Sequence, residues 1–96
     1  MSTKEVQNII VDCLRSYNPK LIGLFGSYIR KENKKKSDID ILVSFHESLS
    51  LLKLIRIENA LSDKLGIKVD LVTEGSIINQ RIKKSILNDL QIIYKA

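Results

Sequence analysis

The alternation of short strand-like runs with longer helical segments restricts the fold of this chain more than any other feature of its sequence. The runs typical of strands are KLIGLF at 20–25, SDIDILVSF at 37–45, IKVDLVT at 67–73 and a shorter QIIY at 91–94. Hydrophobic residues recur at the three- and four-residue spacing of helices in segments 3–19, 48–66 and 77–90. Strands that alternate with helices indicate an α/β (α+β) fold, in which helices pack against a small sheet.

The apolar faces of the helical segments predict part of the core. In the second segment, the residues that share one face are Leu51, Leu54, Ile57, Leu61 and Leu65, and Gly66 follows as the expected stop. In the third segment, Ile78, Ile82 and Ile86 lie four residues apart. Pro19 is expected to mark the end of the first helix. We expect these hydrophobic residues to serve packing alone.

Length and composition suit one soluble folded domain. The 96 residues are 44% hydrophobic and 28% charged, which favours a single domain over residues 1–96. No apolar run reaches the ~18 residues of a membrane span, and the first residues, MSTKEVQN, carry no signal-peptide pattern. The single cysteine, Cys13, cannot form an internal disulfide. We therefore expect a protein of the reducing cytoplasm.

Two carboxylates stand inside one of the predicted strands. Asp38 and Asp40 alternate with Ile39 and Ile41, so both acids should point to the same face. Neighbouring carboxylates repel, and burying either of them without a partner is costly. Arg30, a lysine or a divalent cation must offset this charge. An Asp-x-Asp pair suits Mg²⁺, which prefers one or two carboxylates completed by waters and substrate phosphates.

A third acid, Asp70, has the same setting in the next predicted strand. Val69 and Leu71 flank it and should point to the opposite face. If the two strands are neighbours, three carboxylates converge on one patch, which is difficult to explain as surface decoration. The sequence therefore predicts a metal site formed by Asp38, Asp40 and Asp70.

The Gly26-Ser27 step, between the first strand and a predicted short helix, is a candidate phosphate site. Glycine lets a backbone approach a ligand closely. Backbone N–H groups at a helix start, together with the Ser27 hydroxyl, would form an anion pocket. Because this turn precedes the acids, it indicates a cradle for a triphosphate that faces the metal site.

With these residues in place, the chain resembles a known family. GSYIRKENKKKSDIDILV at 26–43 is similar to the Gly-Ser…Asp-x-Asp motif of the DNA polymerase β-type nucleotidyltransferase superfamily. The compact length and the segment LGIKVDLVTEGSIINQRIKKSILNDLQIIY at 65–94 resemble the minimal nucleotidyltransferases, the MNT-domain proteins. The resemblance implies the nucleotidyltransferase palm fold, a small mixed sheet with helices packed on it.

The resemblance also implies roles for the motif residues. Asp38 and Asp40 match the acids that bind both of two Mg²⁺ ions, and Asp70 matches the third carboxylate, which favours deprotonation of the attacking hydroxyl. Gly26 and Ser27 match the pair that contacts the nucleotide phosphates. The implied reaction is in-line attack on the α-phosphate of a nucleoside triphosphate, with release of pyrophosphate.

Two positions depart from the pattern Gly-Ser-x-Ala-Arg-Gly that is common in the family. Ile29 replaces the alanine and Lys31 replaces the second glycine, whereas Arg30 is kept. Arg30 would pair with a carboxylate or reach a phosphate. Lys31 would strain the backbone if that glycine takes a positive φ. Since the acids and the Gly-Ser pair are intact, we expect tuned activity rather than its loss.

The resemblance further implies a protein partner. Many stand-alone MNT proteins are antitoxins that transfer AMP from ATP to a tyrosine of a HEPN-domain toxin and so silence it. A catalytic palm of this length leaves no room for a separate acceptor-recognition domain, so a macromolecular acceptor with its own binding surface fits. We expect a hetero-complex with a HEPN toxin. A homodimer is the other assembly that a small domain with an exposed core edge allows.

Other functions stay open at this point. Transfer to a small molecule such as an aminoglycoside would need an extra domain or a cleft between subunits. A binding-only antitoxin that acts by occlusion would not need the acids. The net charge of +5 permits nucleic-acid binding, but no aromatic stacking platform or groove-reading motif supports it. The lysine-rich KENKKK at 31–36 is typical of a solvated loop, or it attracts the triphosphate or an acidic partner surface. Glu47 and Glu74 stand at strand ends from which they could approach the site.

Overall fold

The computed structural model describes residues 2–26, 38–77 and 79–96. Within these ranges the elements follow in the order α1 (Thr3–Arg15), β1 (Pro19–Phe25), β2 (Ile39–Phe45), α2 (Leu51–Leu65), β3 (Val69–Thr73), the 3-10 helix η1 (Glu74–Ser76), α3 (Gln80–Asp89) and β4 (Gln91–Lys95). Each strand run that the sequence predicts is present, and the short C-terminal one becomes β4. None of the helices in the described ranges is long and apolar enough to cross a membrane.

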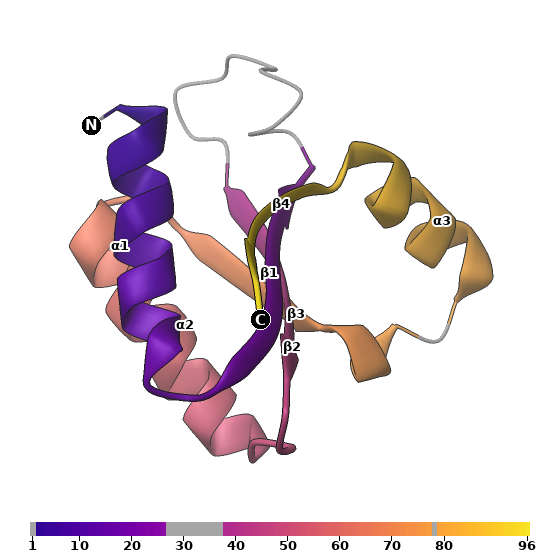
Figure 1. Cartoon of the computed structure of the whole chain (residues 1–96), viewed down its shortest axis with the longest axis horizontal. Helices are drawn as coiled ribbons and strands as arrows, with labels where there is room; N and C mark the ends of the chain where they lie inside the picture. Colours follow the sequence, from indigo (N-terminus) through magenta and orange to yellow (C-terminus); the bar gives the residue numbers. More distant parts are fainter. Residues whose placement is uncertain (1, 27–37, 78) are drawn as a thin grey trace.

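The strands form a mixed sheet in the order β3-β2-β1-β4 (Figure 1). β1 pairs antiparallel with β2 and with β4, whereas β2 and β3 run parallel. A parallel pair needs a long crossover, and α2 supplies it. The predicted α+β fold with a small mixed sheet is therefore confirmed.

The two faces of the sheet are covered unequally. α1 and α2 lie side by side on one face, and α3 lies on the other (Figure 1). Strand alternation sends Ile39, Ile41 and Val43 of β2 towards α1 and α2. The fully packed core on this side consists of Val6, Ile10, Leu14, Ile22, Leu24, Ile39, Ile41, Val43, Ile57, Leu61, Leu65 and Val69. The opposite face of β2 and β3 is left more open.

Capping residues set the ends of α2. The Ser50 hydroxyl accepts a hydrogen bond from the Lys53 N–H at 3.2 Å and begins the helix. Gly66 takes φ +67° and ends it, as predicted. The first helix, by contrast, ends at Arg15, and Pro19 begins β1 instead of closing the helix. Asn18, at φ +54°, turns the chain before the proline.

Two predicted core positions are wrong. Leu51 is 73% exposed and Ile82 is 55% exposed, although Ile57 and Ile86 on the same predicted faces are buried. Leu51 is the first residue of α2, and Ile82 lies in the first turn of α3. Periodicity shows which side of a helix is apolar but not how far along the helix the packing partner reaches. Ile78 lies outside the described residues.

The close approach of β1 to the end of α3 yields a stability prediction. A β-carbon at Gly23 would collide with the Leu90 side chain and lie 3.3 Å from the Gln91 carbonyl oxygen. Overpacking of this kind costs about 1–3 kcal/mol. We expect Gly23→Val to lower the free energy of unfolding by that amount in urea denaturation. Gly75→Val is the matched control, because nothing lies within 4 Å of a β-carbon there. Equal stability of the two variants would contradict this packing.

Candidate active site

Asp40 and Asp70 are direct neighbours across the parallel strand pair. In the β2–β3 register, Asp40 lies opposite Asp70, and Ile39 lies opposite Val69. Since Ile39 and Val69 face the core with α1 and α2, alternation puts both acids on the other face. Adjacent strands are about 4.8 Å apart, so the two carboxylates can reach one cation. The two strands are therefore neighbours, which is the condition on which a shared patch of acids depends.

Both acids line one pocket of about 520 Å³ on this face of the sheet. β1 contributes Phe25 to the pocket, and α3 contributes Ile82 and Ile86. The exposed Ile82 is therefore a wall of this pocket rather than part of the core. Asp40 and Asp70 are half-buried, so a ligand in the pocket can contact them.

Gly26 lies directly against the Asp40 carboxylate. The residue before it, Phe25, pairs with Asp40 across β1 and β2. Gly26 takes φ +80°, and a β-carbon there would collide with the Asp40 carboxylate. Only glycine satisfies both conditions without strain. The glycine of the predicted phosphate turn is thus beside the acids, whereas Ser27 and Arg30 lie outside the described residues.

Asp38 is half-buried and immediately precedes β2. It is not among the residues that line the pocket with Asp40 and Asp70. In the described part of the chain, no group of three His, Cys, Asp or Glu side chains is placed so as to hold a metal ion. The strand ladder begins at Ile39, so it orients Asp40 but does not fix Asp38. The structure brings Asp40 and Asp70 together, and the metal role of Asp38 stays a prediction.

The donor set on this face has the chemistry that Mg²⁺ requires. Asp40 and Asp70 present hard oxygen ligands from two rigid strands, and the pocket beside them leaves room for waters and phosphates. The residues present therefore fit a magnesium site that is completed by a phosphate-bearing ligand.

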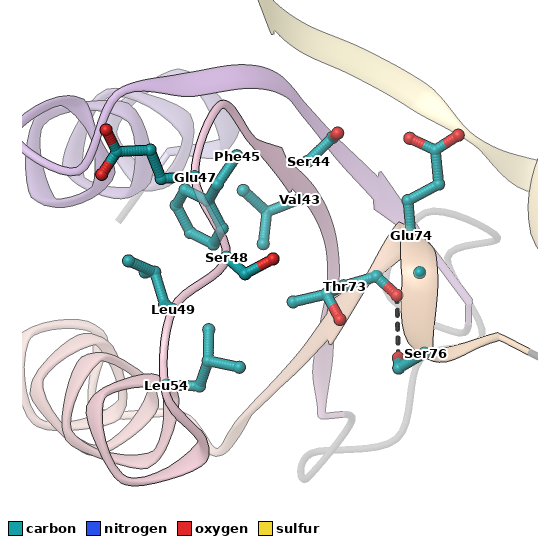
Figure 2. Close-up of a pocket in the computed structure, with 11 residues that line it drawn as sticks. Val43, Ser44, Phe45, Glu47, Ser48, Leu49, Leu54, Thr73, Glu74 and Ser76 are labelled. Carbon is teal, nitrogen blue, oxygen red and sulfur yellow. Dashed lines mark hydrogen bonds between the residues drawn. The ribbon is translucent and has the colours of Figure 1, made fainter.

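Glu47 and Glu74 belong to a different pocket. Figure 2 shows this second pocket, of about 400 Å³, with both glutamates among its lining residues at the C-terminal ends of β2 and β3. Asp40 and Asp70 lie near the starts of the same strands. Ser76 of η1 lines both pockets and stands between them. The two glutamates therefore do not join the pair of acids.

Glu58 of α2 is a residue of the site that the sequence analysis missed. Its Oε2 accepts a hydrogen bond from the Leu71 N–H at 2.8 Å, next to Asp70, and its side chain lines the pocket of the acids. The signal in the sequence was weak: a single polar residue beside the buried Ile57 on an amphipathic helix. Nothing in the local pattern says which strand such a residue reaches.

The comparison with protein families identifies the family of this chain. A nucleotidyltransferase domain model matches residues 7–93, which include Gly26, Asp40 and Asp70. The chain belongs to the nucleotidyltransferase domain family. The predicted class of enzyme, a nucleotidyltransferase, is confirmed.

Relatives in sequence point to one branch of this family. The chain is 61% identical over 74 residues to a Methanocaldococcus jannaschii protein that is provisionally named a protein adenylyltransferase, with 77% of this chain and 76% of that protein covered. It is 38% identical over 94 residues to the protein adenylyltransferase MntA of Thermococcus cleftensis, with 94% of each chain covered.

Solved structures agree with this placement. The chain superposes with TM-score 0.84 and 27% identity on a chain of a toxin-antitoxin crystal structure with AMP-PNP, covering 94% of this chain and 73% of that one. A complex of a tri-AMPylated Shewanella oneidensis HEPN toxin with an MNT antitoxin gives TM-score 0.81 and 25% identity, covering 99% and 74%. A structure provisionally described as a minimal nucleotidyltransferase gives 0.77 and 28%, covering 92% and 89%. The predicted resemblance to minimal nucleotidyltransferases and MntA-type antitoxins is confirmed.

The contact of Gly26 with Asp40 yields a prediction with an internal control. Gly26 and Gly66 both take positive φ, so alanine strains each backbone by roughly 1–2 kcal/mol. At Gly26 the new methyl group also displaces the Asp40 carboxylate, and at Gly66 it meets nothing within 4 Å. Misplacing a reacting group by about 1 Å can lower a rate about 100-fold. We therefore expect Gly26→Ala to lower the rate of nucleotidyl transfer about 100-fold in a labelled-nucleotide assay.

The Gly66→Ala protein should carry the same backbone strain, measured as a lower Tm in thermal unfolding, and should keep its activity. If the two variants lost activity equally, general destabilisation rather than the position of Asp40 would be the cause.

Proposed function

We propose that this chain is a Mg²⁺-dependent protein adenylyltransferase that transfers AMP from ATP to a tyrosine hydroxyl of a HEPN-domain toxin and acts as its antitoxin in the cytoplasm. The observation that carries the proposal is the pair of acids, Asp40 and Asp70, beside Gly26 in a nucleotidyltransferase domain. A relative that matches over nearly its full length is named a protein adenylyltransferase. The structures with AMP-PNP and with a tri-AMPylated HEPN toxin support the nucleotide and the partner.

The acids would act through bound metal. In this proposal Asp38, Asp40 and Asp70 hold two Mg²⁺ ions, which when bound stabilise the attacking and leaving oxygens of an in-line displacement. The position of Asp40 is fixed on its strand, because it pairs with Phe25 of β1 on one side and with Asp70 of β3 on the other. Its carboxylate also lies against Gly26. This fixed geometry suits a ligand that must not shift during the reaction.

The nucleotide phosphates would lie at the end of β1. Gly26, without a side chain, lets the phosphates approach the backbone beside Asp40, and Ser27 and Arg30 would add a hydroxyl and a cation. The acceptor hydroxyl attacks the α-phosphorus, the new P–O bond forms, and the bond to the β-phosphate breaks so that pyrophosphate leaves. Asp70 favours loss of the hydroxyl proton from the acceptor.

Removing one carboxylate should stop the transfer. We expect Asp40→Asn and Asp70→Asn each to lower it by at least about 100-fold, because even groups that merely orient metal ligands are worth about 10- to 100-fold. The assay incubates the protein with labelled ATP, Mg²⁺ and a HEPN-domain protein encoded next to this chain in its genome, and follows label on that partner. Asp63→Asn, at an exposed acid of α2 outside the pocket, is the control. Absence of transfer by the folded wild-type protein would contradict the proposal.

A double variant distinguishes catalysis from neutralisation by occlusion. Asp38→Asn with Asp40→Asn should spare the fold, because it removes repulsion between neighbouring acids. If AMP transfer silences the toxin, cells that express the toxin with this variant should arrest like cells without antitoxin. Growth equal to that with the wild-type antitoxin would favour a binding-only antitoxin, which is the alternative function. Label that appears on a small molecule instead of the partner would favour a small-molecule transferase.

A further inference from the structure

We propose that Glu58 and Ser62 of α2 are positioning residues for Asp70, because they hold the β3 backbone on both sides of that acid. The inference rests on the proposed function, since it treats Asp70 as a ligand of the metal–nucleotide complex. In this inference α2 packs into the core and also sets the geometry of the site on the opposite face of the sheet.

The orientation of the β3 backbone determines which of its N–H groups α2 can reach. β3 lies at the edge of the described sheet, next to β2. In a parallel ladder, alternate residues turn their N–H and C=O groups towards the neighbouring strand, and the residues between them turn these groups away. The Lys68 carbonyl accepts from the Ile39 N–H at 2.9 Å, so Lys68 and Asp70 bond towards β2. Val69 and Leu71, on either side of Asp70, therefore turn their N–H groups away from the sheet.

Side chains of α2 accept both of these outward hydrogen bonds. The Val69 N–H donates to the Ser62 Oγ at 2.9 Å, and the Leu71 N–H donates to the Glu58 Oε2 at 2.8 Å. Glu58 and Ser62 lie four residues apart on the helix, a rise of about 6 Å. Val69 and Leu71 lie two residues apart on the strand, a rise of about 6.6 Å. The two spacings match, so one helix face can hold both peptide groups that flank Asp70.

The helix that carries these acceptors is itself held firmly. Ile57 and Leu61, each next to one of the acceptors in the sequence, are buried in the core cluster. The Glu58 carboxylate is a charged acceptor, and hydrogen bonds to charged acceptors are roughly twice as strong as neutral ones. Asp70 is therefore fixed from β2 on one side and from α2 on the other. A carboxylate that must meet a metal within a fraction of an ångström needs such support.

The test measures the affinity of the whole chain for Mg·ATP by isothermal titration calorimetry, at a temperature where circular dichroism shows every variant folded. We expect Glu58→Ala to weaken binding about 10- to 100-fold, as is typical of groups that orient metal ligands. Glu58→Gln should recover most of the affinity that Glu58→Ala loses, because its neutral amide oxygen can still accept the Leu71 N–H. Asp63→Ala, at an exposed acid of the same helix, should bind like the wild type.

A double-mutant cycle separates positioning from a merely structural role. If Glu58 acts through Asp70, adding Glu58→Ala to Asp70→Asn should weaken Mg·ATP binding no further, whereas independent effects would multiply. Ser62→Ala removes a single hydroxyl and should weaken binding in the same direction, so it serves as the test if Glu58→Ala does not fold.

Three results would overturn the inference. The first is wild-type affinity for Mg·ATP in the folded Glu58→Ala protein or, if that protein does not fold, in Ser62→Ala. The second is a Glu58→Gln protein that binds Mg·ATP as weakly as Glu58→Ala. The third is that Glu58→Ala and Asp70→Asn weaken binding independently in the double-mutant cycle. Loss of affinity in Glu58→Gln would indicate that the charge of Glu58, rather than its hydrogen bond, matters. Failure of the wild-type chain itself to bind Mg·ATP would overturn the proposed function, and this inference with it. The results with the variants therefore test this inference separately from the proposed function.

Discussion

The parallel pairing of β2 with β3 is the constraint on which the rest of the structure depends. The register sets Asp40 opposite Asp70, and the period of two along each strand sets Ile39 and Val69 into the core at the same time. A slip of one residue would turn Asp70 into the core and Val69 into the pocket. Burial of the apolar residues on one face therefore also holds the two acids together on the other.

The unequal cover of the sheet divides stability from chemistry. On one face α1 and α2 close the core with fully buried aliphatic side chains. On the other face α3 packs against β1 and leaves the acids beside an open pocket. A second closed layer would bury two like charges without water, which is costly. The open face allows these acids to exist in a small protein, and it is where a phosphate-bearing ligand can enter.

The local pattern of the sequence predicts the elements well and their packing less well. Alternation in SDIDILVSF and IKVDLVT gave the strands and the faces of Asp40 and Asp70, and Gly66 ended α2 where a left-handed cap was expected. Leu51 and Ile82 continue the helical periodicity and are nevertheless exposed, since Leu51 is the first residue of α2 and Ile82 lines the open pocket. Pro19 is predicted to mark a helix end and instead starts β1, because α1 ends at Arg15. The errors at Leu51 and Pro19 concern the ends of helices, and the error at Ile82 concerns what covers one helix face. Neighbouring elements decide both.

The sequence by itself determined the kinds of residue available to the site and the face of each strand on which they stand, since both follow from residue identity and backbone period. The resemblance of its motifs to the minimal nucleotidyltransferases also followed from the residues alone. Tertiary structure decided which of them meet: Asp40 with Asp70, Gly26 with Asp40, and Glu58 with the backbone beside Asp70. These pairs are distant in the chain, and their contacts depend on strand order, register and the placement of α2. Such long-range geometry is fixed by burial of the whole core, and local periodicity carries no information about it.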